Sequence, residues 1–438
     1  MSEVNGSDTA WILVSVALVM LMTPGLALFY GGMVRAKNVL STYMHSFMAM
    51  GVVTLAWITV GYSLAFAPTQ GGIVGGLDHL MLEGVGLTPR EGTTIPHLLF
   101  MAFQMMFAII TPALISGAYA ERLKFSTYVV FTLLWSVLVY SPICHWVWGP
   151  GGWLAERGAL DFAGGTVVHL SSGVSALVIA VVLGRRLGYP NRKAPPHNLT
   201  MTMLGAGLLW FGWFGFNAGS ALGANGLAAL ALVNTHVAAG LGAVSWAAVE
   251  WIRHGKPTAL GAASGLVAWL VAITPAAGFV SPMASVAIGL VAGGVCYAGV
   301  QLKGVLKYDD TLDAFGVHGI GGLAGALLTG VFASTAWNEA GKDGLLAGNV
   351  PLFIEQIVAV AASGIYAGIA SLVLLKVLDA VMGLRVAKDV EQEGLDATLH
   401  GEEAYALAAG PGGRSPVVDD DEERELRRGA VAKVAGGA

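Results

Sequence analysis

Two histidines lie inside long apolar stretches, and each follows an aspartate at close range. His169 ends the sequence DFAGGTVVH, which begins at Asp161, and His318 lies in DAFGVHG, which begins at Asp313. Ionisable side chains are costly in an apolar segment and usually face a bundle interior or a cavity. Two neighbouring imidazoles would titrate as one coupled system and could relay protons or bind a small polar solute. A purely structural hydrogen bond to a neighbouring helix is the alternative for each.

Asp161 has two interpretations. It precedes an apolar segment by a few residues, where a carboxylate caps a helix N-terminus and complements the helix dipole. Its charge could also favour a cation near the mouth of a pathway. We expect Asp313 to cap the second histidine segment in the same way. No third His, Cys or carboxylate has the spacing of a metal ligand, so we expect no metal site.

Aromatic residues cluster in stretches that could converge. Phe103 and Phe107 are four residues apart, on one face of a helix. Trp148 lies in the loop just after the apolar segment 124–146, and Phe216 precedes Ser220 by four residues. Rings of this kind can hold a small desolvated cation with roughly 2 kcal/mol or more, and a serine would add a hydrogen-bond acceptor. Aromatic belts at membrane interfaces are the alternative explanation.

The composition indicates that membrane helices must position these residues. Of the 438 residues, 55% are hydrophobic and 12% are charged, about half the charged share of a soluble protein. The 61 glycines let helix backbones approach closely, as in polytopic bundles. An ordinary soluble enzyme is excluded, and no basic stripe points to nucleic acid. We expect Cys144 and Cys296 to pack as small apolar side chains.

Apolar segments long enough to cross a bilayer, which takes about 20 residues, divide the chain into eleven predicted spans. The predicted fold class is an all-α polytopic membrane protein. Glu3 and Asp8 precede the first segment, where a signal peptide has positive charges, so we expect the first segment to be a retained span. The segments are 10–33, 41–66, 95–119, 124–146, 164–184, 199–220, 226–250, 258–277, 281–302, 312–335 and 351–382.

Positive charge predicts the orientation of these spans in the cell membrane. Twelve Lys and Arg residues fall in loops after odd-numbered segments, whereas loops after even-numbered segments hold Arg90, Arg157 and Lys342. Positively charged loops stay in the cytoplasm, so we expect the N-terminus outside and the C-terminus inside. The two histidines lie five spans apart, which indicates two inverted halves of five helices followed by a final helix. In such folds the site lies where the halves meet.

The chain after residue 382 differs from the predicted membrane domain, 1–382. The segment 383–409 is polar but contains spaced apolar residues, and we expect it to dock as a cytoplasmic regulatory segment. Residues 410–438 have the glycine and acidic content of a disordered tail. The spaced apolar residues are Leu384, Val386, Val390, Leu395 and Leu399.

Several long motifs in one order resemble those of the ammonium transporter family, the Amt and Mep proteins with their Rhesus relatives. The resemblance covers nearly the whole chain, including the polar segment after the last span, and the chain is similar to the prokaryotic Amt type. The motifs are FYGGMVRAKN (29–38), FQMMFAIITPALISGAYAER (103–122), LDFAGGTVVHLSSG (160–173), WFGFNAGS (213–220) and DDTLDAFGVHGIGG (309–322).

The resemblance implies a homotrimer in membrane lipid, with one conduction path per subunit and no bound cofactor. It also implies that a trimeric PII-type signal protein can block the cytoplasmic face, where loop 185–193 and the polar tail would contact it. The residues that match the outer ammonium site are Phe103, Phe107, Trp148, Ser220 and Asp161. Those that match the hydrophobic gate are Phe107 and Phe216, and those that match the twin histidines of the pore are His169 and His318.

The expected chemistry follows from the cost of charge in an apolar lumen, which excludes intact cations. Ammonium can leave its proton behind and cross as ammonia, whereas potassium cannot. We expect deprotonation near Trp148, Asp161 and Ser220, and proton transfer through or beside the histidines with net charge movement. Two other roles stay open: an ammonium sensor that signals through its tail, and an electroneutral ammonia channel of the Rhesus kind. An intramembrane enzyme is not expected, because no nucleophile elbow or metal cluster is present.

Overall fold

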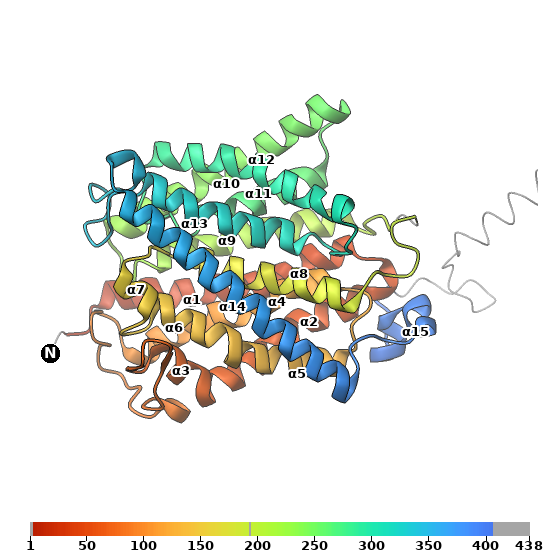
Figure 1. The fold of residues 1–438 in the computed structure, drawn as a ribbon, viewed down its shortest axis with the longest axis horizontal. Helices are drawn as coiled ribbons and strands as arrows, with labels where there is room; N and C mark the ends of the chain where they lie inside the picture. The colour runs from red at the N-terminus through yellow and green to blue at the C-terminus, as the bar shows by residue number, and fades with distance from the viewer. Residues whose placement is uncertain (1–2, 192–193, 406–438) are drawn as a thin grey trace, which may run out of the picture.

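The computed structural model describes residues 3–191 and 194–405. Long helices run side by side in one bundle, with their connections at its two ends (Figure 1). The N-terminus and α7 (Trp153–Arg157) lie at one end, and α15 (Lys388–Glu393) lies at the other. We call them the α7 end and the α15 end. The predicted tail, 410–438, and residues 406–409 of the predicted regulatory segment lie outside the described residues.

Helices account for nearly all regular structure in the described chain. The α-helices are α1 (Gly6–Met33), α2 (Val39–Ala56), α3 (Tyr62–Phe66), α4 (His97–Tyr119), α5 (Phe125–Trp135), α6 (Ser141–Trp148), α7, α8 (Ser171–Leu183), α9 (Leu199–Gly219), α10 (Gly226–His254), α11 (Ala259–Ile273), α12 (Pro282–Leu306), α13 (Ile320–Phe332), α14 (Val350–Met382) and α15. The π-helical turns are η2 (Trp57–Gly61), η4 (Ser136–Tyr140), η5 (Gly165–Leu170), η6 (Phe315–Gly319) and η8 (Asp396–His400). Short 3₁₀ turns are η1 (Ala36–Asn38), η3 (Leu80–Leu82) and η7 (Leu345–Ala347), and β1 (Thr69–Gln70) pairs antiparallel with β2 (Val74–Gly75).

Ten helical runs of the described chain are long and apolar enough to cross a membrane, which agrees with an all-helical membrane protein. The predicted segment 258–277 instead contains α11, a helix of 15 residues, shorter than the roughly 20 residues that a crossing needs. Pro275 has no N–H with which to continue the helix. Its carbonyl oxygen accepts the N–H of Phe162 at 3.1 Å, so the chain turns there toward the segment before η5.

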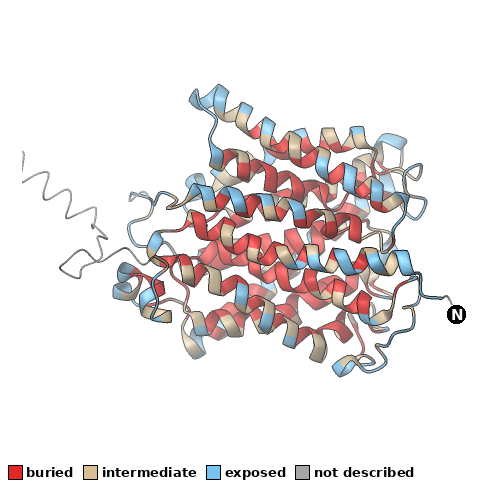
Figure 2. Cartoon of the chain, turned by 180° about the vertical axis from the view of Figure 1, so that it is seen from behind, coloured by how far each residue is buried: buried red, intermediate tan, exposed pale blue. Residues whose placement is uncertain are grey.

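Buried residues fill the interior of the bundle, and exposed residues lie at its ends and outer faces (Figure 2). In the most apolar window of α4, 83% of residues are buried, whereas in that of α14 the share is 28%. The exposed face of α14 carries large apolar side chains, including Ile354, Ile365 and Val373. A water-exposed helix would be polar on that face, so this surface suits lipid tails.

Two close backbone approaches bring the histidine turns together. A Cβ atom on Gly173 of α8 would lie 2.0 Å from the backbone nitrogen of Gly319 in η6. On α13, a Cβ atom on Gly322 would lie 2.6 Å from the carbonyl oxygen of Gly165 in η5. Each histidine turn is therefore crossed by the helix that continues the other. Only glycine allows helix backbones to approach this closely.

Candidate functional site

The carboxylate of Asp161 caps η5, the π-helical turn that carries His169. Its Oδ1 atom accepts the N–H groups of Gly164 and Gly165 at 2.8 and 2.6 Å. Its Oδ2 atom accepts those of Thr166 and Val167 at 2.7 and 3.2 Å, and the Thr166 hydroxyl donates to it as well. One buried carboxylate thus satisfies four backbone donors that a helix start leaves free. These contacts fit the capping interpretation.

The equivalent cap of η6 is Asp310, so the expectation that Asp313 fills this role is wrong. Asp310 accepts the N–H groups of Ala314 and Phe315 at 3.1 and 2.8 Å. Asp313 has a left-handed backbone with φ 63°, and its carboxylate pairs with Lys303 at 2.5 Å. The side chain of Asp313 therefore pairs with Lys303 of α12 and does not cap the turn.

The spacing in the sequence could have identified this cap. Asp310 stands eight residues before His318, as Asp161 stands eight residues before His169. The shorter interval from Asp313 to His318 breaks that match. Both histidines therefore occupy π-helical turns whose first N–H groups are held by an aspartate at the same distance along the chain.

The two histidine rings lie next to each other in the buried centre of the bundle. Their planes are inclined by 15° and their centroids are 5.4 Å apart. A cavity of about 10 Å³ lies between these rings, Phe216 and Trp213, which is about the space of one water-sized solute. Within the described chain, neither ring nitrogen of His169 nor Nδ1 of His318 has a hydrogen-bond partner. These nitrogens are free to bond a small polar solute.

Phenylalanines separate this centre from a larger cavity toward the α7 end. The ring of Phe107 lies 4.3 Å from that of Phe216 and 5.9 Å from that of Trp148, measured between centroids. Phe103 packs edge-on behind Phe107 at 5.0 Å and is fully buried. Phe107 lines the larger cavity and Phe216 the central one, and the planes of the two rings are tilted by 40° to each other.

The larger cavity toward the α7 end, which we call the outer cavity, measures about 180 Å³. Phe107, Trp148 and Ser220 line it. The indole N–H of Trp148 donates to the carbonyl oxygen of Asp161 at 2.8 Å, which fixes the orientation of its ring. The hydroxyl of Ser220 donates to the carbonyl oxygen of Phe216 at 2.8 Å, so its oxygen lone pairs remain available as acceptors. Phe103 and Asp161 do not line this cavity. Arg90 and Gln104 do, although the sequence interpretation assigned them no role.

A second large cavity, of about 220 Å³, opens on the other side of the histidines. His318 lines both this inner cavity and the central one. Tyr30 and Met33 at the end of α1, and Asp313, line it as well. The central and inner cavities thus share His318, and the outer and central cavities are separated by the contact between Phe107 and Phe216.

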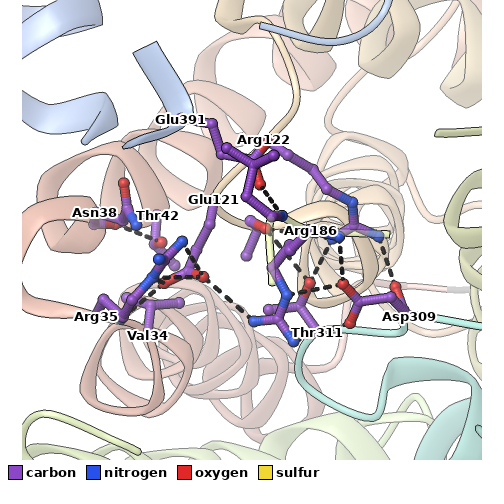
Figure 3. A network of polar contacts seen from close by, with 12 residues as sticks. Val34, Arg35, Asn38, Thr42, Glu121, Arg122, Arg186, Asp309, Thr311 and Glu391 are labelled. Carbon is purple, nitrogen blue, oxygen red and sulfur yellow. Dashed lines mark hydrogen bonds and ion pairs between the residues drawn. The ribbon is translucent and has the colours of Figure 1, made fainter. Parts of the chain in front are cut away.

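Ion pairs connect the loops at the α15 end (Figure 3). Glu121 pairs with Arg35 at 3.0 Å and with Arg186 at 3.2 Å. Arg186 also pairs with Asp309 at 2.8 Å, next to the cap of η6. Burial raises the pKa of Glu121, but the two arginines outweigh it and hold the pKa below its ordinary value of 4.5. The network ties the loops after α1, α4 and α8 to the start of the second histidine turn.

The predicted regulatory segment docks on the same loops. Glu391 accepts the backbone N–H of Leu187 at 2.7 Å and pairs with Arg385 at 2.7 Å. Asp396 accepts the N–H groups of Leu40 and Ser41 at 3.0 and 2.8 Å, at the start of α2. Three of the five predicted docking residues are buried, namely Leu384, Val386 and Leu395.

The relatives of the chain show the family to which it belongs. Residues 10–405 match the Ammonium Transporter Family. The chain belongs to the ammonium transporter family. It is 54% identical over 400 residues to an ammonium transporter of Bacillus subtilis, covering 91% of this chain and 98% of the relative. It is 48% identical over 401 residues to ammonium transporter Amt1 of Archaeoglobus fulgidus, covering 92% and 100%.

Solved structures of the ammonium transporter family have the same fold. The crystal structure of Saccharomyces cerevisiae Mep2 aligns with a TM-score of 0.83 at 37% identity and covers 88% of this chain and 91% of that one. The structure of a sensor Amt protein aligns with a TM-score of 0.83 at 29% identity and covers 90% and 98%. Mep2 and a sensor Amt protein thus share this bundle.

Proposed function

We propose that this protein moves ammonium across a cell membrane by separating it into ammonia and a proton. The proposal rests on the order of the parts along the bundle: the outer cavity, the two phenylalanine rings, the central cavity with the two histidines, and the inner cavity. The central cavity has a volume of about 10 Å³, so it suits one molecule of the size of ammonia or water. A hydrated cation does not fit there.

Each part of the path has a role in this mechanism. Aromatic faces of Phe107 and Trp148 attract the cation, and the Ser220 oxygen accepts one of its N–H groups. Phe103 supports Phe107 from behind, and Asp161 holds the turn that carries His169. The proton leaves in the outer cavity, because the apolar passage beyond it penalises charge.

Ammonia then passes the ring of Phe216 and reaches the histidines. The unpartnered ring nitrogens of His169 and His318 can accept or donate hydrogen bonds to ammonia or water and so relay the proton beside it. The proton and ammonia recombine in the inner cavity, which moves one net charge. Potassium has no proton to give up, so this mechanism excludes it.

The same proposal covers the architecture. We place the α7 end outside and the α15 end in the cytoplasm, and take α11 together with the turn that follows it, residues 258–277, as an eleventh crossing. Two inverted halves of five helices, followed by α14, would explain why both histidine turns have an aspartate cap and why α8 and α13 cross them reciprocally. Lipid-facing surfaces such as the exposed face of α14 suit the membrane, and the protein assembles as a homotrimer.

Residues 383–409 regulate transport in this proposal, as a cytoplasmic segment following the membrane domain 1–382. Described residues of the segment contact Leu187, in the loop after α8, and Leu40, at the start of α2, through Glu391 and Asp396. A PII-type signal protein would bind loop 185–193 and this segment, although Arg192 and Lys193 lie outside the described residues.

Electrical recording on liposomes containing purified protein tests the mechanism. Ammonium pulses should give a transient current and potassium pulses none. Replacing both pore histidines, His169→Ala with His318→Ala, should abolish the ammonium current. The matched control is His236→Ala, because His236 is exposed on α10 and stacks on Trp210 away from the path. An unchanged ammonium-selective current in the double variant would contradict the proton relay.

The same recording separates the two alternatives. Ammonia uptake seen as a rise of internal pH, with no current, would identify an electroneutral channel. Silence in both measurements would favour a sensor, the role carried in the name of one structural relative, the sensor Amt protein.

A further inference from the structure

An arginine lines the outer cavity, where the proposed function places a cation. Arg90 shares that lining with Phe107, Trp148 and Ser220. Among the described residues that line the cavity, Arg90 is the one that bears a formal charge. A fixed positive charge in a small cavity opposes the entry of a second cation.

The guanidinium group also occupies aromatic surface. Its Cζ atom lies 4.1 Å from the ring centroid of Phe100 and 5.4 Å from that of Phe66. Both rings line the same cavity. A cation over an aromatic face satisfies the ring's negative potential. Arg90 therefore holds two rings that would otherwise extend the aromatic site of Phe107 and Trp148 outward.

Little around Arg90 neutralises it. The uncharged groups Tyr62 and Cys144 face it, and the nearby carboxylate is that of Glu91. Glu91 is exposed and does not line the cavity, so water screens part of its effect and it compensates the charge of Arg90 only partly. Among the residues that line the outer cavity, Arg90 therefore contributes the one formal charge to its potential.

We propose that Arg90 is a tethered cation that sets the ammonium concentration at which the outer site fills. It competes with ammonium for aromatic surface and repels it electrostatically, and both effects lower affinity. The inference rests on the proposed function of the outer cavity as the ammonium site. It identifies Arg90 as a residue that tunes affinity without contacting the pore histidines.

Three variants test the proposal in the same liposome recording, with ammonium titrated from low to saturating concentration. Arg90→Gln removes the charge, Arg90→Lys keeps it, and Glu91→Gln removes the partly compensating charge from an exposed position. The matched control is Arg157→Gln, which makes the same charge change outside the cavity, where Arg157 pairs with Glu355.

For Arg90→Gln we expect the half-saturating ammonium concentration to fall about fivefold, the order of effect of one unit charge across a water-filled cavity. The maximal current should stay near the native value, because the pore is unchanged. Arg90→Lys should stay close to the native protein, and Glu91→Gln should raise the half-saturating concentration. The differences should shrink as ionic strength rises, since salt screens the charge. Arg157→Gln should match the native protein.

An unchanged or higher half-saturating concentration in Arg90→Gln would overturn the proposal. If Arg90→Gln does not assemble, Glu91→Gln decides, and a value at or below the native one overturns it. The native protein gives the separate control on function. If it carries no ammonium current and takes up no ammonia, the proposed function fails whatever the variants do.

Discussion

Replacing Asp161 by asparagine separates the two roles that its carboxylate could have. The carbonyl oxygen of asparagine can replace the Oδ1 atom and accept the N–H groups of Gly164 and Gly165. The Oδ2 atom becomes an NH₂ group that faces two backbone N–H donors and the hydroxyl of Thr166. Two buried backbone donors therefore lose their acceptor, and the Thr166 hydroxyl loses a charged acceptor and must turn to accept from the NH₂ group.

The magnitude follows from these contacts. A hydrogen bond to a charged group contributes roughly 1.5–3 kcal/mol, and an unsatisfied buried donor costs about 1–3 kcal/mol. Since hydrogen bonds at one atom are not additive, we take about 1 kcal/mol for each of these three groups. Asp161→Asn should then lower the free energy of unfolding by about 3 kcal/mol, and Asp161→Ala by more.

Thermal unfolding of the detergent-purified protein, followed by tryptophan fluorescence, measures the change alongside the ammonium current. The control is Asp8→Asn, because the carboxylate of Asp8 accepts the N–H of Ala224 at 2.8 Å but is only half-buried. Asp8→Asn should lower the free energy of unfolding by less than about 1 kcal/mol. If Asp161→Asn melts like the native protein and yet loses its current, the carboxylate acts on the cation and the capping argument is refuted.

Two further predictions concern the packing of the histidine turns and the pH dependence of the α15 end. Gly173→Ala should prevent correct assembly, because the new Cβ atom would lie 2.0 Å from a backbone nitrogen of η6. The control Gly207→Ala should be neutral or stabilising, because its Cβ atom would have nothing within 4 Å. Size-exclusion chromatography and thermal unfolding measure both variants, and comparable yields and melting midpoints would contradict this prediction. The lowered pKa of Glu121 means that its ion pairs stabilise the protein above pH 4.5 and are lost as the pH falls through the folded-state pKa. The difference in melting midpoint between the native protein and Glu121→Gln should therefore narrow as the pH falls below about 4.5, and a constant difference would show that the pairs contribute nothing.

The sequence alone was enough to predict the helical membrane fold and the family, since both depend on local or linear patterns. Apolar runs of about 20 residues can be read without knowledge of the partners against which they pack. The docking of Leu384, Val386 and Leu395 was also predictable, because an apolar residue in a polar segment needs a surface to cover it. The predicted segment 258–277 shows the limit, since the turn at Pro275 shortened its helix.

The site depended on tertiary structure wherever side chains from distant segments meet. The spacing from aspartate to histidine was visible in the sequence, but only the backbone conformation showed that Asp310 caps the turn while Asp313 pairs with Lys303. No linear pattern places Arg90 in a cavity with Trp148 and Ser220, because the three residues come from different loops and helices. Apolar periodicity and motifs thus determine which helices form, whereas the potential inside the outer cavity depends on which side chains the packed helices bring within a few ångströms of one another.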